Sequence, residues 1–145
     1  MKKLLALLIC FMIVGVSACT GEDRPIQLKQ LPDVARQLLS LHFPDMKIAY
    51  LTEDDGVFSK SYEVGFINGD EIDFAKDGMW TEVNCKHSVV PHAIIPDLIR
   101  TYVAENHPSM SILKIERKKR GYEVQLHSGL ELTFDQKFNV VKIEH

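Results

Sequence analysis

Cysteine, tryptophan and net charge are all scarce in this sequence of 145 residues. Its three cysteines are too few for a disulfide scaffold of the kind that holds small secreted domains together. With 17 basic and 20 acidic residues the formal charge is only −3, so the chain has no general attraction for nucleic-acid phosphates. The 46% of apolar residues excludes wholesale disorder, and the length allows one domain or two very small ones.

Catalytic and metal-binding constellations are lacking as well. Cys85 and His87 stand two residues apart, but no oxyanion-hole motif or glycine-rich elbow accompanies them, so we interpret Cys85 as a core residue. The spacing from Cys85 through His87 to His92 matches no strong zinc template. Glu71 and Asp73 could flank a glycosidic bond, although alternation on the wet face of a strand explains the pair better. The sequence therefore predicts a protein that is not an enzyme and holds neither metal nor cofactor.

The N-terminus has the layout of a secretory signal. Two lysines at positions 2 and 3 precede an apolar run over residues 4–16, and polarity returns abruptly after residue 19. The run of about 13 residues is too short for a membrane span, which needs about 20. Residues 16–19 (Val-Ser-Ala-Cys) resemble the bacterial lipobox, in which the cysteine is acylated and the chain is cut just before it. Ordinary signal cleavage after residue 18 fits the same residues, so both alternatives stay open.

Cleavage would change what the composition means. Without residues 1–18 the chain has 15 basic and 20 acidic residues, a net charge of −5. Acyl chains on Cys19 would anchor it, because each buried CH₂ adds about 0.8 kcal/mol. Residues 19–29 would then be a flexible tether. The sequence thus predicts an exported protein, lipid-anchored to the bacterial cell envelope and facing the periplasm or the cell surface.

The remaining chain contains an internal repeat. Leu-Pro-Asp at 31–33 matches Ile-Pro-Asp at 95–97, an offset of 64, and Tyr-Glu-Val at 62–64 recurs at 122–124, an offset of 60. A four-residue difference in one loop reconciles the two offsets. We therefore divide the chain into unit 1, residues 30–87, and unit 2, residues 88–145, which together form one domain.

Each unit shows one helical pattern followed by strand patterns. A proline opens each helix, where its missing N–H is harmless, and Pro44 or Pro108 stops it. Alternating apolar residues then flank hairpin turns such as Asn68-Gly69. A single unit could hardly bury enough surface to fold alone. The prediction is an α+β fold in which two units of one helix and about four strands form one roughly eight-stranded antiparallel sheet, with both helices on one face.

The uncovered face of this sheet is expected to be polar and, in unit 1, acidic. Thr81 and Val83 match apolar positions of unit 2, and that parity places Trp80 on the open face, where Tyr50 is also expected. An exposed tryptophan and tyrosine among carboxylates would suit a binding patch. A one-residue register shift at a bulge would instead tuck Trp80 under a linker or pack it at the sheet edge, and this alternative stays open. The candidate partner-binding residues are Trp80, Tyr50, Glu82, Glu63 and Asp73.

The residues from Tyr62 to Trp80 (YEVGFINGDEIDFAKDGMW), echoed from Tyr122 to Phe134, resemble the PepSY-like, beta-lactamase-inhibitor-like family. Members are small secreted or lipid-anchored proteins of the bacterial envelope. The resemblance covers about residues 30–145 and implies tandem helix-plus-sheet units with no catalytic residues to carry over. Unit 2 departs from the pattern, because Val140 occupies the position that Trp80 occupies in unit 1. A partner surface built on that aromatic would therefore be asymmetric.

These observations predict a non-enzymatic module that binds a protein or peptide of the envelope. The resemblance implies that it inhibits or regulates an envelope hydrolase by steric docking of the open face. The alternative is a small-ligand or envelope-polymer binder that uses the same face. The basic run over residues 114–120 is interpreted as a solvated hairpin tip, and contact with anionic lipid near the anchor is its functional alternative.

Overall fold

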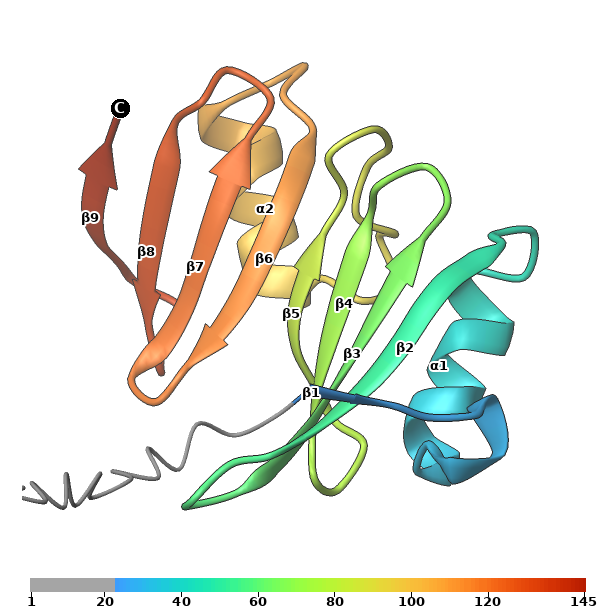
Figure 1. Cartoon of the computed structure of the whole chain (residues 1–145). Helices are drawn as coiled ribbons and strands as arrows, with labels where there is room; N and C mark the ends of the chain where they lie inside the picture. The colour runs from blue at the N-terminus through green and yellow to red at the C-terminus, as the bar shows by residue number, and fades with distance from the viewer. Residues whose placement is uncertain (1–22) are drawn as a thin grey trace, which may run out of the picture.

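The computed structural model describes residues 23–145 and shows one antiparallel sheet backed by two helices (Figure 1). The nine strands lie side by side in chain order, and both helices lie behind the sheet in this view, so the front face is uncovered. The strands are β1 (Asp23–Pro25), β2 (Ile48–Asp55), β3 (Lys60–Phe66), β4 (Glu71–Ala75), β5 (Trp80–Asn84), β6 (Ile112–Lys118), β7 (Gly121–Leu126), β8 (Glu131–Asp135) and β9 (Val140–Glu144). The helices are α1 (Asp33–His42) and α2 (Asp97–Asn106), with a short 3₁₀ turn, η1 (Leu28–Gln30), before α1.

This architecture confirms the predicted α+β fold class and differs in one strand. The ninth strand is β1, which pairs with β2 so that Asp23 lies opposite Asp54 and Pro25 opposite Thr52. It falls within the expected tether 19–29, so that segment is not flexible throughout. The expected signal, residues 1–18, and Cys19 lie outside the described residues. Neither helix of the described chain is long and apolar enough to cross a membrane.

The sequence repeat is also a repeat of strand register. In unit 1 Tyr62 lies opposite Phe74, and in unit 2 Tyr122 lies opposite Phe134. Both units carry a bulge between the first and second strand and another between the third and fourth. The units join edge to edge where β5 pairs with β6, so their two sheets become one.

The helices pack on the sheet through apolar residues of successive turns. Each begins directly after a proline and ends at His42 or Asn106, and the cap residue that follows, Phe43 or His107, directly precedes the next proline. Ala35 and Leu39 are the buried residues of α1, and Ile99 and Val103 those of α2. They meet the inward-facing residues of the sheet in one continuous core. Among the largest side chains buried there are Phe74, Phe134, Ile72, Leu132, Val64 and Val124.

Candidate functional site

Carboxylates line up across the open face of the sheet. The strand register places Glu63 of β3, Asp73 of β4, Glu82 of β5, Glu116 of β6 and Glu123 of β7 directly opposite one another in a single file. We call these five residues the acidic row. Like charges directly opposite each other in neighbouring strands destabilise a sheet, so the row opposes folding unless cations offset it.

Lysines pair with three of the five carboxylates of the acidic row. Lys114 Nζ lies 3.1 Å from Glu82, and Lys118 Nζ lies 2.7 Å from Glu116 and 3.8 Å from Glu123. No lysine, arginine or histidine within residues 23–145 forms an ion pair with Glu63 or Asp73. The unit 1 end of the row therefore carries uncompensated negative charge.

The ionisation of Asp73 reflects this imbalance. Partial burial, together with the neighbouring charges of Glu63, Glu82 and Glu71, raises the pKa of Asp73 from 3.8 to about 6, and Lys114 counters only part of the shift. In unit 2 the equivalent position is Thr133, which lies opposite Glu123 and Lys142. The unfavourable carboxylate is thus a property of unit 1 and is not required by the fold.

A polar hollow of about 220 Å³ opens beside Asp73. It is lined by four carboxylates, three hydroxyl residues and one tyrosine: Asp23, Asp54, Glu63, Asp73, Thr52, Ser61, Thr81 and Tyr62. Asp54 Oδ1 is buried and has no hydrogen-bond partner among residues 23–145. No lining residue in this part of the chain carries a positive charge, so the hollow can accept hydrogen bonds from a cationic group supplied from outside.

Tyr50 lies on the open face, as predicted, and is 41% exposed. Its ring occupies the space beside Gly65 that a side chain would fill, since an added Cβ would come within 2.1 Å of the ring. The hydroxyl donates a hydrogen bond to Glu63 and a longer one, 3.4 Å, to Glu71. The hydrogen bond to Glu63 is the main cause that raises the pKa of Tyr50, followed by burial and the two carboxylate charges. Tyr50 therefore helps to hold Glu63 within the acidic row.

Trp80 does not lie on the open face, so the strand parity of the sequence was misleading and the bulge alternative is right. Asp73 lies opposite Glu82, but the next residue, Phe74, lies opposite Trp80, so Thr81 is inserted as a bulge. The shift turns Trp80 to the helix-covered face, where it is 6% exposed. Its ring lies 6.4 Å from that of Tyr122, centroid to centroid, and the guanidinium carbon of Arg117 stands 4.4 Å over it.

Of the residues weighed for catalysis, Cys85 lies in the core and His87 at the surface. Cys85 is fully buried, and burial raises the pKa of its thiol, which disfavours the reactive thiolate. His87 is exposed, and its backbone N–H donates to Asp70. Asp70, which is 1% exposed, also accepts hydrogen bonds from Ser88 and Asn68. This buried carboxylate, which sequence analysis missed, ties the β3–β4 turn to the segment after β5.

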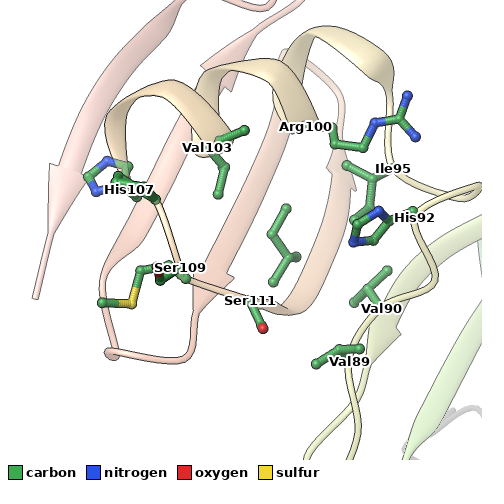
Figure 2. Close-up of a pocket in the computed structure, with 13 residues that line it drawn as sticks. Val89, Val90, His92, Ile95, Arg100, Val103, His107, Ser109 and Ser111 are labelled. Carbon is green, nitrogen blue, oxygen red and sulfur yellow. The ribbon is translucent and has the colours of Figure 1, made fainter.

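A second pocket, of about 290 Å³, lies on the other side of the sheet beside α2 (Figure 2). Its walls are mainly apolar and include Ile95 and Val103. The guanidinium of Arg100 and the ring of His92 lie on one side of it and the ring of His107 on the opposite side, so these polar groups do not all converge on one point. Residues 23–145 also contain no group of three or more histidine, cysteine or acidic side chains arranged to hold a metal ion.

Two further surface features were missed or undervalued in the sequence. Glu116 belongs to the acidic row, although it lies in the basic run over residues 114–120. Val57 and Phe58, at the tip of the β2–β3 hairpin, are 73% and 99% exposed. Their signal was an apolar pair inside a turn-forming segment, Gly56 to Ser59.

Comparison with known proteins agrees with the fold and the repeat. Residues 60–142 match the family described as "Putative beta-lactamase-inhibitor-like, PepSY-like". A crystal structure from Bacteroides vulgatus, described as a "putative periplasmic protein" of the DUF2874 family, is 51% identical, with a TM-score of 0.84 over 86% of this chain and 98% of that one. None of the curated proteins matches the sequence.

Two other solved structures are similar over the same region. One, from Bacteroides thetaiotaomicron, is named a "putative calcium-regulated periplasmic protein"; it is 48% identical, with a TM-score of 0.82 over 85% of this chain and 97% of that one. The other, from Bacteroides vulgatus and of unknown function, is 35% identical, with a TM-score of 0.80 over 86% of this chain and all of that one. The matched residues and these identities show that the chain belongs to the beta-lactamase-inhibitor-like, PepSY-like family, to which these structures from Bacteroides are similar.

Proposed function

We propose that this protein is a lipid-anchored, non-enzymatic binding module of the bacterial envelope that docks a protein partner on its open sheet face. The partner presents a lysine or arginine to Asp73 and Glu63. The family description favours an envelope hydrolase as partner, inhibited by steric cover of its active site without any chemistry by this chain. The anchor is Cys19, acylated after cleavage of residues 1–18.

The uncompensated end of the acidic row is the observation that carries the proposal. Asp73 has a raised pKa and, like Glu63, forms no ion pair among the described residues, whereas Glu82, Glu116 and Glu123 each pair with a lysine. A partner cation seated between Asp73 and Glu63 would replace repulsion by attraction. Hydrogen bonds to charged groups contribute about 1.5–3 kcal/mol each, so one such contact is worth about tenfold or more in affinity.

A second candidate is a divalent cation in the same hollow. It is favoured by the four carboxylates around the hollow and by the calcium regulation named for the relative from Bacteroides thetaiotaomicron. The carboxylates are not arranged as a preformed metal site among the described residues, so binding would require their side chains to converge.

The test compares three proteins as bait in intact envelopes: the wild type, the isosteric double variant Asp73→Asn/Glu63→Gln, and the control Glu131→Gln/Glu144→Gln. The control removes two carboxylates that lie opposite each other in unit 2. We expect a partner that the wild type and the control retain and the double variant loses. Its purified form should bind at least about tenfold more weakly to the double variant, with an affinity that falls as salt rises.

Retention of the same proteins by all three baits, or of none by the wild type, would refute docking at this site. Calcium provides the second arm of the experiment. If calcium chloride raises the unfolding temperature of the wild type and the control but not of the double variant, and no protein is retained, the cation is the ligand.

A further inference from the structure

The tip of the β2–β3 hairpin exposes more apolar surface than its own fold explains. Phe58 is 99% exposed and Val57 is 73% exposed, so neither contributes to the core. An exposed aromatic and an adjacent aliphatic side chain at the end of a hairpin favour insertion into an apolar environment.

The strand order places this tip at a particular end of the sheet. Because all strands are antiparallel and lie in chain order, the β2–β3, β4–β5, β6–β7 and β8–β9 turns share one end. β1 is antiparallel to β2, so its N-terminal residue, Asp23, points toward that same end and lies opposite Asp54. We call this the tether end, because the chain that precedes Asp23 reaches the domain there.

Chain length then relates the hairpin tip to the expected anchor. Cys19 stands four residues before Asp23, which spans at most about 14 Å of extended chain. Val57 stands three residues beyond Asp54, about 10 Å along the hairpin. A bilayer that holds acyl chains on Cys19 is therefore within reach of Val57 and Phe58.

Exposed cations lie at the tether end as well. Lys119 and Arg120 form the β6–β7 turn, and both are exposed and without an ion pair among the described residues. Asp55, the carboxylate nearest the hairpin tip, pairs with Arg24 and Lys60, whereas Asp54 and Asp23 have no ion pair among the described residues. The unpaired cations of the β6–β7 turn and the apolar side chains of the β2–β3 tip are a combination that suits the surface of an anionic bilayer.

We propose that the tether end of the sheet rests on the membrane, with Val57 and Phe58 inserted at the boundary between headgroups and acyl chains and with Lys119 and Arg120 against anionic phospholipid headgroups. This rests on the lipid anchor of the proposed function. The strands then stand upright on the bilayer, and the open face with its acidic row points sideways, toward proteins held in the same membrane.

The test uses the full mature protein, extracted from bacterial membranes with its own acyl chains and reconstituted into vesicles of phosphatidylethanolamine and phosphatidylglycerol with brominated acyl chains. Phe58→Trp reports on the hairpin tip. Ile67→Trp is the matched control, because Ile67 is 68% exposed at the β3–β4 turn, at the opposite end of the sheet. The emission of buried Trp80 is measured in the wild type and subtracted.

We expect the emission of Phe58→Trp to shift to shorter wavelength and to be quenched by bromine, while Ile67→Trp shows neither change. Equal behaviour of the two variants in vesicles that hold the protein would refute membrane contact of the tip, and the lipid anchor would stand. Protein that does not stay with the vesicles would refute the anchor and this proposal together, and docking on the acidic row would be unaffected. Lys119→Glu/Arg120→Glu should reduce the quenching of Phe58→Trp in anionic vesicles and leave it unchanged in vesicles of phosphatidylcholine.

Discussion

Replacing Asp73 with asparagine should stabilise the protein at neutral pH. The substitution preserves shape and removes the charge that faces Glu63 and Glu82 across the sheet. No hydrogen bond to the Asp73 carboxylate within the described structure is lost. Substitution of an exposed carboxylate normally changes the free energy of unfolding by no more than about 0.5 kcal/mol in either direction. A larger stabilisation by Asp73→Asn would therefore be unusual for such a residue.

The size of the effect follows from the pKa of Asp73. A pKa raised from 3.8 to about 6 means that the folded protein holds this proton more tightly than the unfolded chain. The ionised carboxylate therefore lowers the free energy of unfolding, and this cost is absent below about pH 4, grows as the pH rises toward 6, and is complete above it. At 1.36 kcal/mol per pKa unit the upper bound is about 3 kcal/mol, and solvent screening at this partly exposed site reduces it to about 1–2 kcal/mol.

Urea unfolding, followed by the fluorescence of Trp80, measures the effect at pH 8, 6 and 4. The free energy of unfolding of Asp73→Asn should exceed that of the wild type by about 1–2 kcal/mol at pH 8, and the difference should vanish by pH 4. Glu105→Gln, which removes an exposed carboxylate of α2, is the control and should change little at any pH. No gain at pH 8, or a gain that is the same at pH 4, would refute the assigned repulsion.

Three further perturbations separate the anchor, the open face and the core. Cys19→Ala should release the exported protein from the membrane fraction, and continued membrane binding in a carbonate wash would place the anchor elsewhere. Gly65→Ala should push the ring of Tyr50 off the sheet, because an added Cβ would lie 2.1 Å from it; an unchanged Tyr50 environment by NMR would contradict this contact. Asp70→Asn should cost about 2 kcal/mol at pH 7, since this buried carboxylate accepts hydrogen bonds from Ser88, Asn68 and a backbone N–H. Burial raises the pKa of Asp70, but these hydrogen bonds outweigh burial and leave the pKa lowered. The difference in the free energy of unfolding between the variant and the wild type should therefore shrink as the pH falls below about 4. A difference that is constant with pH would contradict the role of the Asp70 charge.

Repetition made the fold accessible to prediction. Matches at fixed offsets aligned the two units, and prolines, an Asn-Gly turn and alternating apolar residues then defined one helix and four strands in each. The ninth strand, β1, was not predicted, because its sequence, Asp-Arg-Pro, has low strand propensity. It forms because the edge of β2 offers unpaired backbone groups to the chain that passes beside it.

The candidate site was harder to predict, and Trp80 shows why. Alternation assigns faces correctly only while strand register is unbroken, and Thr81 breaks it by one residue. The alternation assigned Glu63, Asp73 and Glu82 to the open face correctly, because their pairing is continuous. Trp80 lies on the other side of the bulge, and its face was predicted wrongly. The same bulge recurs at Val141 in unit 2, so it is a feature of the repeat. The residue types at the two positions do not indicate it.

By itself the sequence determined the duplicated unit, its helix boundaries and the acidic character of the open face, because these depend on local residue types and their spacing. Only the tertiary structure decided which charges meet. The pairing of β5 with β6 places Glu82 opposite Glu116 and brings Lys114 to Glu82, and nothing in unit 1 brings a lysine to Asp73. Such pairings join residues far apart in the chain, and their energies depend on distance and burial, which a linear pattern does not contain.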